Sequence, residues 1–408
     1  MNTVITPNWV TKDTAVGFKN HQKLIRNFDR TWDKTWDNTP DGAQIGYTVQ
    51  IRIEQRWQVF EGQALQQQAI LNRTTPLTIS HQYQVAHGWS SADKTVAVEE
   101  VQRRYTMPAG RAMANKWDVA AGQEVYRLVA NSIGAPGVPI SSDGVYTDGV
   151  AAMRNLGVPD DFVAVIDPKS QSNLLKANFT LFNPQNFHGA NFKSGMFSGP
   201  ALGIDEWNWD PNLPTHTTGN FTTSTPLVDG ALQTGSTLVT KGWGTFSFKA
   251  GDVFTILGVN KVNPISYVDT GDLQQFSVQV DLAGTTAATF TIYPPIIPSG
   301  PLQTVTVSPA NNAAITFNGA TSPTAGTLST TTSKQSLLFN PAAFAVVMVD
   351  LAKNLPGAVS GWMNDEATGI AMRYVDQYQI QTDQIPRRID TLGGIGVIIP
   401  EFALRAWS

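Results

Sequence analysis

The chain has 408 residues and a mass of 44.2 kDa, which is enough for two or three domains. Its net charge of −4 argues against a protein whose main task is to grip nucleic acid. The absence of cysteine excludes disulfides, thiolate catalysis and zinc–thiolate sites. Charged residues make up only 15% of the chain, so much of the surface is either uncharged and polar or buried against other chains.

The N-terminal residues 1–45 are polar, with scattered aromatic residues that include Trp32 and Trp36. They show no sustained apolar period, so we predict an arm that packs on another surface. No basic segment followed by an apolar stretch is visible, and no apolar run is long enough to cross a membrane. We therefore expect a soluble protein, made in the cytoplasm, with no membrane partner.

Residues 46–60 alternate between apolar and polar side chains, which predicts a strand. A second β-rich run covers residues 76–85, after the glutamine run at 66–68. We predict a long two-stranded hairpin with a polar tip. Because an isolated hairpin is marginally stable in water, a partner surface is implied.

The pattern becomes helical from Glu99, with apolar residues mostly three and four positions apart. It predicts a long helix near residues 108–133. Thr106 is the candidate N-cap and Gly134 the candidate C-cap. Pro108 suits either the first turn of the helix or a kink.

Residues 147–178 read as helix, strand and helix, and the strand at 162–166 is apolar enough to be buried on both faces. Thr- and Ser-rich stretches then bracket strand-like pieces at short intervals, which favours an antiparallel barrel or sandwich over 226–331. Since α/β sequence resumes at Leu337, the β module is predicted to be an insertion into a host domain. Three domains in series would leave each flank with too little core.

The last part of the chain starts with an apolar run at 340–354, which is predicted to form a helix. Two strands are predicted to follow, at 367–380 and 387–407. Gly393, Gly394 and Gly396 lack the lysine and the helix of a phosphate-binding loop, so we predict a bulge or tight turn there.

The stretch at 201–221 combines acids with tryptophans, which is the composition of a sugar-cleaving cleft. Asp205 and Glu206 are adjacent, however, and Asp210 begins a turn between prolines. We therefore predict no catalytic residue. The five histidines form no closely spaced pair, and no metal or cofactor site is expected. The stretch is instead predicted to be a loop that joins two domains, with the residues Asp205, Trp207, Trp209 and Asp210.

Several stretches resemble the major capsid proteins of tailed bacteriophages, in particular the P22-like coat protein family with the HK97-like fold. They lie at 201–219, 249–264, 337–351 and 369–405, and the last fits best. The resemblance covers essentially the full chain. It implies an α+β fold with an N-terminal arm at 1–45, an extended loop at 46–92, a peripheral domain with a long helix at 93–136 and 361–408, an axial domain at 137–225 and 332–360, and an inserted β domain at 226–331.

The resemblance also implies a non-enzymatic protein of the virion that assembles with itself into hexamers and pentamers in the cytoplasm of a host bacterium. Scaffolding and portal proteins are the implied partners, with a decoration protein as a further one. Double-stranded DNA would be enclosed without sequence-specific binding.

Covalent cross-linking between an extended-loop lysine and a neighbouring asparagine occurs in one branch of this fold. No lysine occurs between Thr35 and Asp93, so we predict a non-covalent shell. The candidate inter-subunit contacts are Arg52, Glu54, Arg56, Arg73, Trp32 and Trp36. For each of the charged residues, a solvated hairpin face is an equally good interpretation.

Two functions from other classes stay open. One is a carbohydrate-binding or glycan-cleaving protein that uses residues 205–210 together with the β module. The other is a surface-layer or adhesin-like protein, which the missing signal peptide disfavours.

Overall fold

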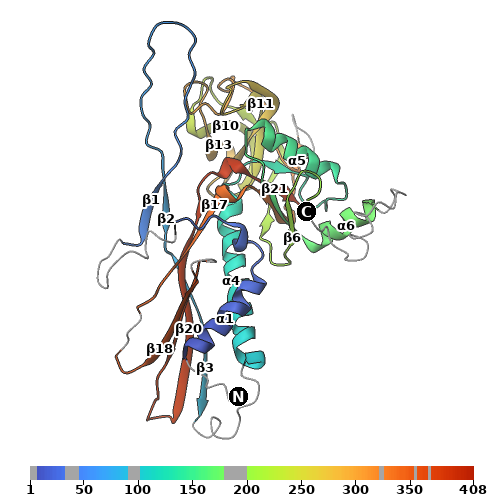
Figure 1. Cartoon of the computed structure of the whole chain (residues 1–408). Helices are drawn as coiled ribbons and strands as arrows, with labels where there is room; N and C mark the ends of the chain where they lie inside the picture. The colour runs from blue at the N-terminus through green and yellow to red at the C-terminus, as the bar shows by residue number, and fades with distance from the viewer. Residues whose placement is uncertain are drawn as a thin grey trace. The chain divides into compact units, whose positions relative to one another are not determined.

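The structure is a computed structural model, and it describes residues 7–32, 46–90, 102–178, 200–320, 326–352, 356–365 and 369–408. The chain divides into two compact units, each built from segments that are distant in the sequence. Unit 1 comprises Met1–Ile51, Thr74–Ala121 and Phe344–Ile398. Unit 2 comprises Arg52–Arg73, Gly122–Ala343 and Ile399–Ser408. Figure 1 labels their helices and strands.

The sheet of unit 1 is built on one long strand, β20. The first half of β20 pairs with β19, its second half pairs with β17, and β3 covers the other edge. β18 continues the sheet beyond β19. The strands are β3 (His81–Ser90), β17 (Phe344–Val349), β18 (Val359–Asp365), β19 (Ile370–Asp376) and β20 (Gln384–Val397).

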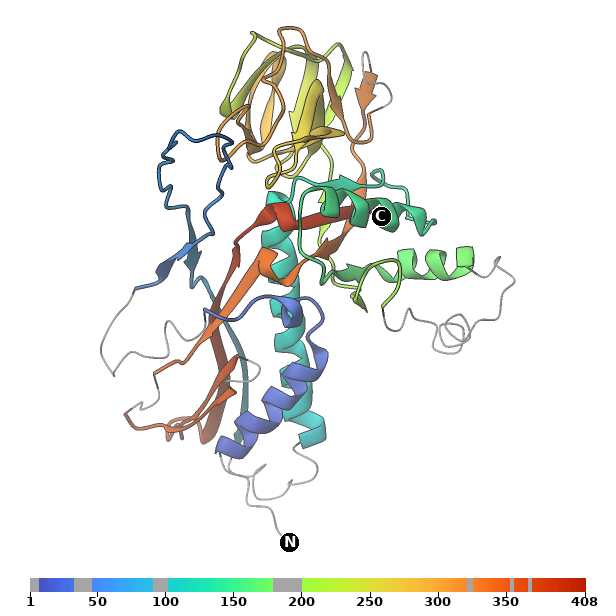
Figure 2. The same cartoon turned by 45° about the horizontal axis from the view of Figure 1, so that its top comes forward.

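Helix α1 (Pro7–His21) crosses helix α4 (Met107–Val125) in unit 1, and the two lie side by side in Figures 1 and 2. A Cβ atom at Gly110 would lie 2.3 Å from the carbonyl oxygen of Thr14, so glycine is required at the crossing. Helix α1 was not predicted. Its buried face includes Thr11 and Thr14, which hides the apolar period, and both hydroxyls donate to carbonyls one turn back.

The predicted long helix is shorter than expected, because α4 ends at Val125 and a 3₁₀ turn, η3 (Tyr126–Leu128), follows. Residues beyond this turn enter β4 (Ser132–Ile133), where pairing with a distant strand overrides local helix propensity. Pro108 lies in the first turn, after the π-helical turn η2 (Gln102–Thr106). The Thr106 hydroxyl is buried and donates to Asp13 of α1.

The prediction of a helix at 340–354 is wrong. A 3₁₀ turn, η4 (Pro341–Ala343), leads directly into β17, which is buried almost throughout. A short, continuous apolar run has no period that separates a buried strand from a buried helix. The predicted bulge or tight turn at Gly393, Gly394 and Gly396 is also wrong, because all three lie inside β20 and pair with β17 without a register shift.

The predicted hairpin strands are also divided differently. β1 (Thr48–Arg52) and β2 (Thr74–Thr78) form a two-stranded sheet, while the continuation of the second predicted strand becomes β3. Residues 53–73 contain no strand and form the connection between β1 and β2, called here the 53–73 segment. The strand at 387–407 is likewise two strands, β20 and β21 (Ala403–Trp407), separated by the 3₁₀ turn η5 (Pro400–Phe402).

Unit 2 contains a host sheet in the order β4-β21-β16-β5-β6, with β7 on β16. Its core joins this sheet to two helices, which confirms the predicted helix, strand and helix over 147–178. The elements are α5 (Gly144–Asn155), α6 (Pro168–Asn178), β5 (Val163–Ile166), β6 (Glu206–Trp209), β7 (Thr215–Thr217) and β16 (Thr332–Phe339).

The predicted β module is present as an insertion, because the host strands β5 and β16 pair with each other from either side of it in the sequence. It is an antiparallel sheet in the order β14-β11-β12-β13-β10-β8-β15, in which β9 also pairs with β10. The sheet closes into a barrel where Val228 of β9 donates to the Ala313 carbonyl at 3.0 Å, next to β14. Closure leaves few exposed strand edges. The strands are β8 (Asn220–Ser224), β9 (Leu227–Val228), β10 (Gly235–Phe248), β11 (Val253–Val262), β12 (Asp269–Val278), β13 (Leu282–Ile296), β14 (Ile315–Phe317) and β15 (Gly326–Leu328).

Aromatic side chains fill this inserted barrel. Trp243 lies in the middle, with its ring centroid 4.9 Å from that of Phe248, and further phenylalanines pack around the pair. Such edge-on aromatic contacts add to the free energy of burial. Within the described ranges, no helix combines the length and the apolar character that a membrane span needs. The predicted domain limits stay a prediction, because the division into two units is coarser and assigns residues 399–408 to unit 2.

Candidate functional site

The acid- and tryptophan-rich stretch is a strand, not the loop that was predicted. Residues Glu206–Trp209 form β6, which lies parallel to β5 at the edge of the host sheet. The alternation of Trp207 and Trp209 with polar residues fits a strand, whereas the turn signal begins only at Asp210.

The two acids that flank β6 bind backbone groups at different places. Asp205 Oδ2 accepts from the Phe162 amide at 3.1 Å, and Asp210 Oδ1 accepts from the Asn212 amide at 2.8 Å. Roughly 16 Å of extended backbone separates them, whereas glycosidase carboxylates lie about 5–9.5 Å apart. Trp207 packs edge-on against Tyr146 and donates to the Ala201 carbonyl at 3.2 Å. This is the geometry of turn caps and packing and not of a cleft.

A buried polar cluster joins the host sheet to the inserted barrel. His216 on β7 places Nε2 2.8 Å from Oδ1 of Asp252, which directly precedes the barrel strand β11. Asp252 also accepts from the backbone amides of Gly219 and Lys249, at 3.1 and 2.8 Å. One carboxylate therefore holds three donors from both sides of the joint.

Arg405 from β21 completes the joint. Its side chain is fully buried, donates to the Gly251 carbonyl and lies 5.2 Å from the Trp407 ring. Burial lowers the pKa of the Arg405 guanidinium to about 10, and the negative charge of Asp252 opposes that shift. The guanidinium remains charged at neutral pH, and it lies close enough to Asp252 for their charges to interact.

The cluster has the form of a proton relay, since the Tyr126 hydroxyl lies 3.4 Å from His216 Nδ1. Both Tyr126 and His216 are buried in the subunit, so the arrangement fixes the two parts of unit 2 together. His216 has no closely spaced histidine partner in the sequence, so it was not predicted to belong to a polar cluster. Its alternation in Thr-His-Thr was the one available signal. Among the described residues, no group of three or more acidic or histidine side chains is placed to hold a metal.

Glutamine side chains tie together the two limbs of the 53–73 segment. The Gln58 amide donates to Gln68 Oε1 at 3.0 Å, and the Leu71 amide donates to Gln55 Oε1 at 3.0 Å. Nearer to the strands, the Ile53 amide donates to the Arg73 carbonyl at 2.9 Å. The segment is thus ordered by side chains in place of a strand ladder.

The same segment exposes apolar side chains in a concentrated group. Val59 is 96% exposed and Leu65 85% exposed. The further members are Trp57, Phe60, Ile70 and Leu71. Exposed apolar groups at this density mark an interaction surface.

The predicted contact residues fall into two sets. Arg52 and Glu54 are exposed, and Trp32 is partly buried in unit 1. Trp36 lies outside the described residues. Arg56, in contrast, forms an ion pair with Glu401 of the same unit.

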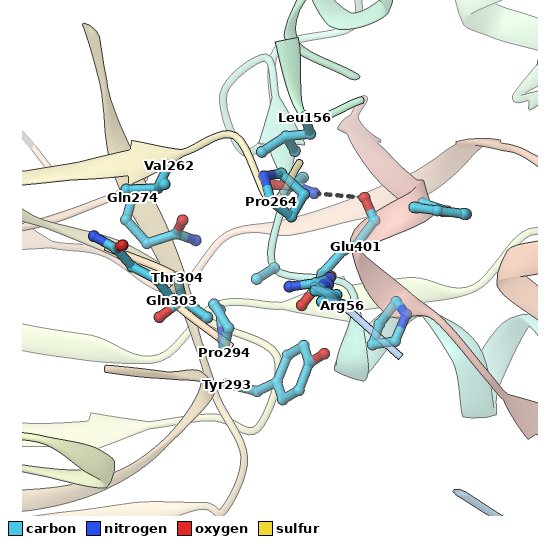
Figure 3. Close-up of a pocket in the computed structure, with 14 residues that line it drawn as sticks. Arg56, Leu156, Val262, Pro264, Gln274, Tyr293, Pro294, Gln303, Thr304 and Glu401 are labelled. Atoms are coloured by element: carbon cyan, nitrogen blue, oxygen red, sulfur yellow. Dashed lines mark hydrogen bonds and ion pairs between the residues drawn. The ribbon is translucent and has the colours of Figure 1, made fainter. Parts of the chain in front are cut away.

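Arg56 and Glu401 line a pocket with barrel residues that include Tyr293 and Pro294 (Figure 3). Burial raises the pKa of the Tyr293 phenol, the charge of Glu401 raises it further, and the charges of Arg73 and Arg56 oppose the shift. The pocket thus gathers Arg56, Tyr293 and Glu401 from three segments of the chain, and Arg73 lies near enough for its charge to act on Tyr293. Sequence reasoning proposed the arginines but missed both of their neighbours.

Comparison with known proteins gives one family and a set of solved structures. Residues 63–404 match the family model described as P22 coat protein, gene protein 5. No curated protein matches the sequence. Similar solved structures include one described as Mycobacterium phage Che8, at 12% identity over 94% of this chain and 91% of that chain, with a TM-score of 0.45. Another is the capsid of Cyanophage P-SCSP1u, at 12% identity over 90% and 84%, with a TM-score of 0.41. The mature capsid of bacteriophage PhiM1 is similar at 9% identity over 89% and 82%, with a TM-score of 0.41.

Proposed function

The chain belongs to the P22 coat protein family and is a coat protein that forms a phage head shell; on this premise we propose that its copies assemble into hexamers and pentamers held by non-covalent contacts. Its α+β fold with an inserted antiparallel barrel is the HK97-like capsid fold that the sequence predicted. The shell would close around double-stranded DNA. Because each chain has a net charge of −4, the shell would enclose the DNA without binding it tightly.

The observation that carries this proposal is the apolar group of the 53–73 segment. Side chains such as Val59 and Leu65 are almost fully exposed in the single subunit, at 96% and 85%. Full burial of each side chain against a partner would stabilise the interface by roughly 1.5–3 kcal/mol. Obligate interfaces are apolar in this way and resemble a domain core cut in two. A second copy of the chain is the partner that a self-assembling shell supplies.

Charged contacts would fix the register of that interface. Arg52 and Glu54 are exposed and lie at the base of the same segment, where a neighbouring subunit can reach them. Arg73, Trp32 and Trp36 stay candidates for the same role. The lack of lysine from Thr35 to Asp93 supports contacts without covalent cross-links.

The family further suggests partners that act during assembly. We infer that a scaffolding protein and a portal protein direct shell closure in the cytoplasm of the host bacterium, and that a decoration protein is a further candidate. The Asp205, Trp207, Trp209 and Asp210 stretch would serve in packing and turn capping at the edge of the host sheet, and not as an enzyme site.

Electron microscopy of the purified recombinant chain tests the proposal. Shells or capsomers with five- and sixfold symmetry are expected, and denaturing electrophoresis should show the monomer band without cross-linked ladders. Stable monomers that hydrolyse glycans would overturn it and would favour the carbohydrate alternative.

A further inference from the structure

The ion pair between Arg56 and Glu401 connects two parts of unit 2 that are remote in sequence. Arg56 belongs to the 53–73 segment, whereas Glu401 belongs to η5, which leads into the host strand β21. Their side chains are only 17% and 23% exposed. An ion pair that is largely shielded from solvent is screened less by salt than an exposed pair.

Glu401 sits on a turn whose carbonyl groups accept hydrogen bonds from residues of the host domain. Asn131 donates to the carbonyls of Glu401 and Ala403, each at 3.3 Å. The Asn340 amide donates to the Phe402 carbonyl at 3.0 Å. The carboxylate is therefore presented from a rigid base, which lowers the entropy lost when Arg56 binds.

The pocket around the pair closes the remaining sides. Tyr293 and Pro294 line it from the barrel (Figure 3). Pro400 and Phe402 of the turn η5 also belong to its lining. Arg73, at the other end of the 53–73 segment, lies near enough for its charge to act on Tyr293. Both ends of the segment thus place a positive charge near Tyr293, while its apolar side chains stay exposed.

We propose that Glu401 is a positioning residue for assembly. Through Arg56 it anchors the base of the 53–73 segment to the subunit's own host sheet, so that the exposed apolar group is ordered before it docks on a second copy of the chain. This rests on the proposed function, since it assigns that apolar group to the interface between copies. This ordering speeds assembly, because a segment that is already ordered loses less conformational entropy on docking.

Hydrogen–deuterium exchange on the full-length, unassembled subunit tests the anchor. In Glu401→Gln, amides of peptides that cover residues 57–71 should exchange about fivefold faster, the effect of losing one partly buried ion pair. The subunit should still unfold in one transition, and its free energy of unfolding should fall only by the amount that corresponds to this fivefold change, about 1 kcal/mol. Light scattering should show assembly slowed by a similar factor. Arg56→Gln should reproduce both effects, and the double variant should add little to either.

Glu61→Gln is the matched control, because Glu61 is an exposed carboxylate on the same segment. It should leave the exchange rate unchanged. The exchanged pair Arg56→Glu with Glu401→Arg should restore slow exchange and the original assembly rate. Unchanged exchange in Glu401→Gln, or faster exchange with an unchanged assembly rate, would overturn the proposal. If the unaltered chain forms no shells, the proposed function fails, while the exchange comparison still decides the anchor.

Discussion

His216 Nε2 and Asp252 Oδ1 lie 2.8 Å apart, with side chains only 3% and 2% exposed, and they come from opposite sides of the joint between the host sheet and the inserted barrel. The pair is directional, unlike apolar packing, so it fixes one orientation of the barrel on its host. Asp252 adds two backbone donors to the same contact. Three donors of the joint thus converge on a single carboxylate.

Replacing Asp252 with alanine should lower the free energy of unfolding by about 4 kcal/mol, because His216 and two backbone amides lose their acceptor in a dry site. Urea unfolding of the subunit measures the loss. Asp229→Ala is the control, since Asp229 forms an exposed ion pair with Lys241 on the same barrel. It should cost about 0.5 kcal/mol. Equal losses in the two variants would show that Asp252 has no special role.

The glycines inside β20 make a second prediction. A Cβ atom at Gly394 would lie 2.1 Å from the Thr78 carbonyl oxygen, so the backbone of β20 and the backbone at the end of β2 would have to separate. Gly394→Ala should destabilise the subunit by about 3 kcal/mol in urea unfolding. Gly88 lies in β3 of the same sheet, where the nearest atom to a new Cβ would be 3.9 Å away. Gly88→Ala should therefore be tolerated, and a similar loss there would contradict the steric explanation.

Lys261 in barrel strand β11 is buried, and this burial lowers the pKa of its ammonium, with the Asp272 charge opposing the shift. Between the folded and unfolded pKa values the unfolded chain holds more protons, so stability rises with pH through that window. Lys261→Met removes the desolvation cost and should stabilise the subunit by about 1 kcal/mol at pH 7.

The advantage of Lys261→Met should shrink as the pH rises through the window between the folded and unfolded pKa values of Lys261, because the folded lysine loses its proton there first. Urea unfolding at pH 7 and pH 9.5 measures this difference between the two proteins. Lys249→Met provides the comparison, because Lys249 is exposed and paired with Asp281. A constant advantage at both pH values would mean that packing, and not ionisation, causes the effect.

The apolar group of the 53–73 segment predicts a separation of folding from assembly. The double variant Val59→Asp and Leu65→Asp should unfold at the urea concentration of the unaltered subunit, since both side chains already face solvent. It should form no shells in electron micrographs. Leu232→Asp, at a site on the barrel that is 78% exposed, should still assemble. Normal shells from the double variant would remove the segment from the interface.

The fold was most predictable where composition or period changes within a short stretch. The inserted barrel follows from Thr-rich borders and frequent turns, and the buried strand β5 follows from its apolar run. This reasoning failed at residues 340–354, because an apolar run such as β17 fits a helix as well as a strand. Pairing with β20 decided between them, and that pairing is a tertiary interaction.

The functional features were less predictable because they join distant residues. His216, Asp252 and Arg405 share no local pattern, and only the meeting of β7, β11 and β21 gathers them. The arginines of the 53–73 segment could be proposed as charged contacts, whereas Glu401 lies 345 positions from Arg56 and gave no signal. A side chain's partner is set by topology, which a single sequence does not state.

The chain enters and leaves the inserted barrel along one antiparallel ribbon. Thr217 of β7 pairs with Thr332 of β16, and Ser224 of β8 pairs with Gly326 of β15. A short turn could therefore connect Thr217 to Thr332 and leave the pairing of β16 with β5 and β21 intact. In evolutionary terms the barrel is a separable module. A two-strand connection of this kind lets a coat protein gain, exchange or lose an inserted domain without a change in the strand pairing of its host sheet.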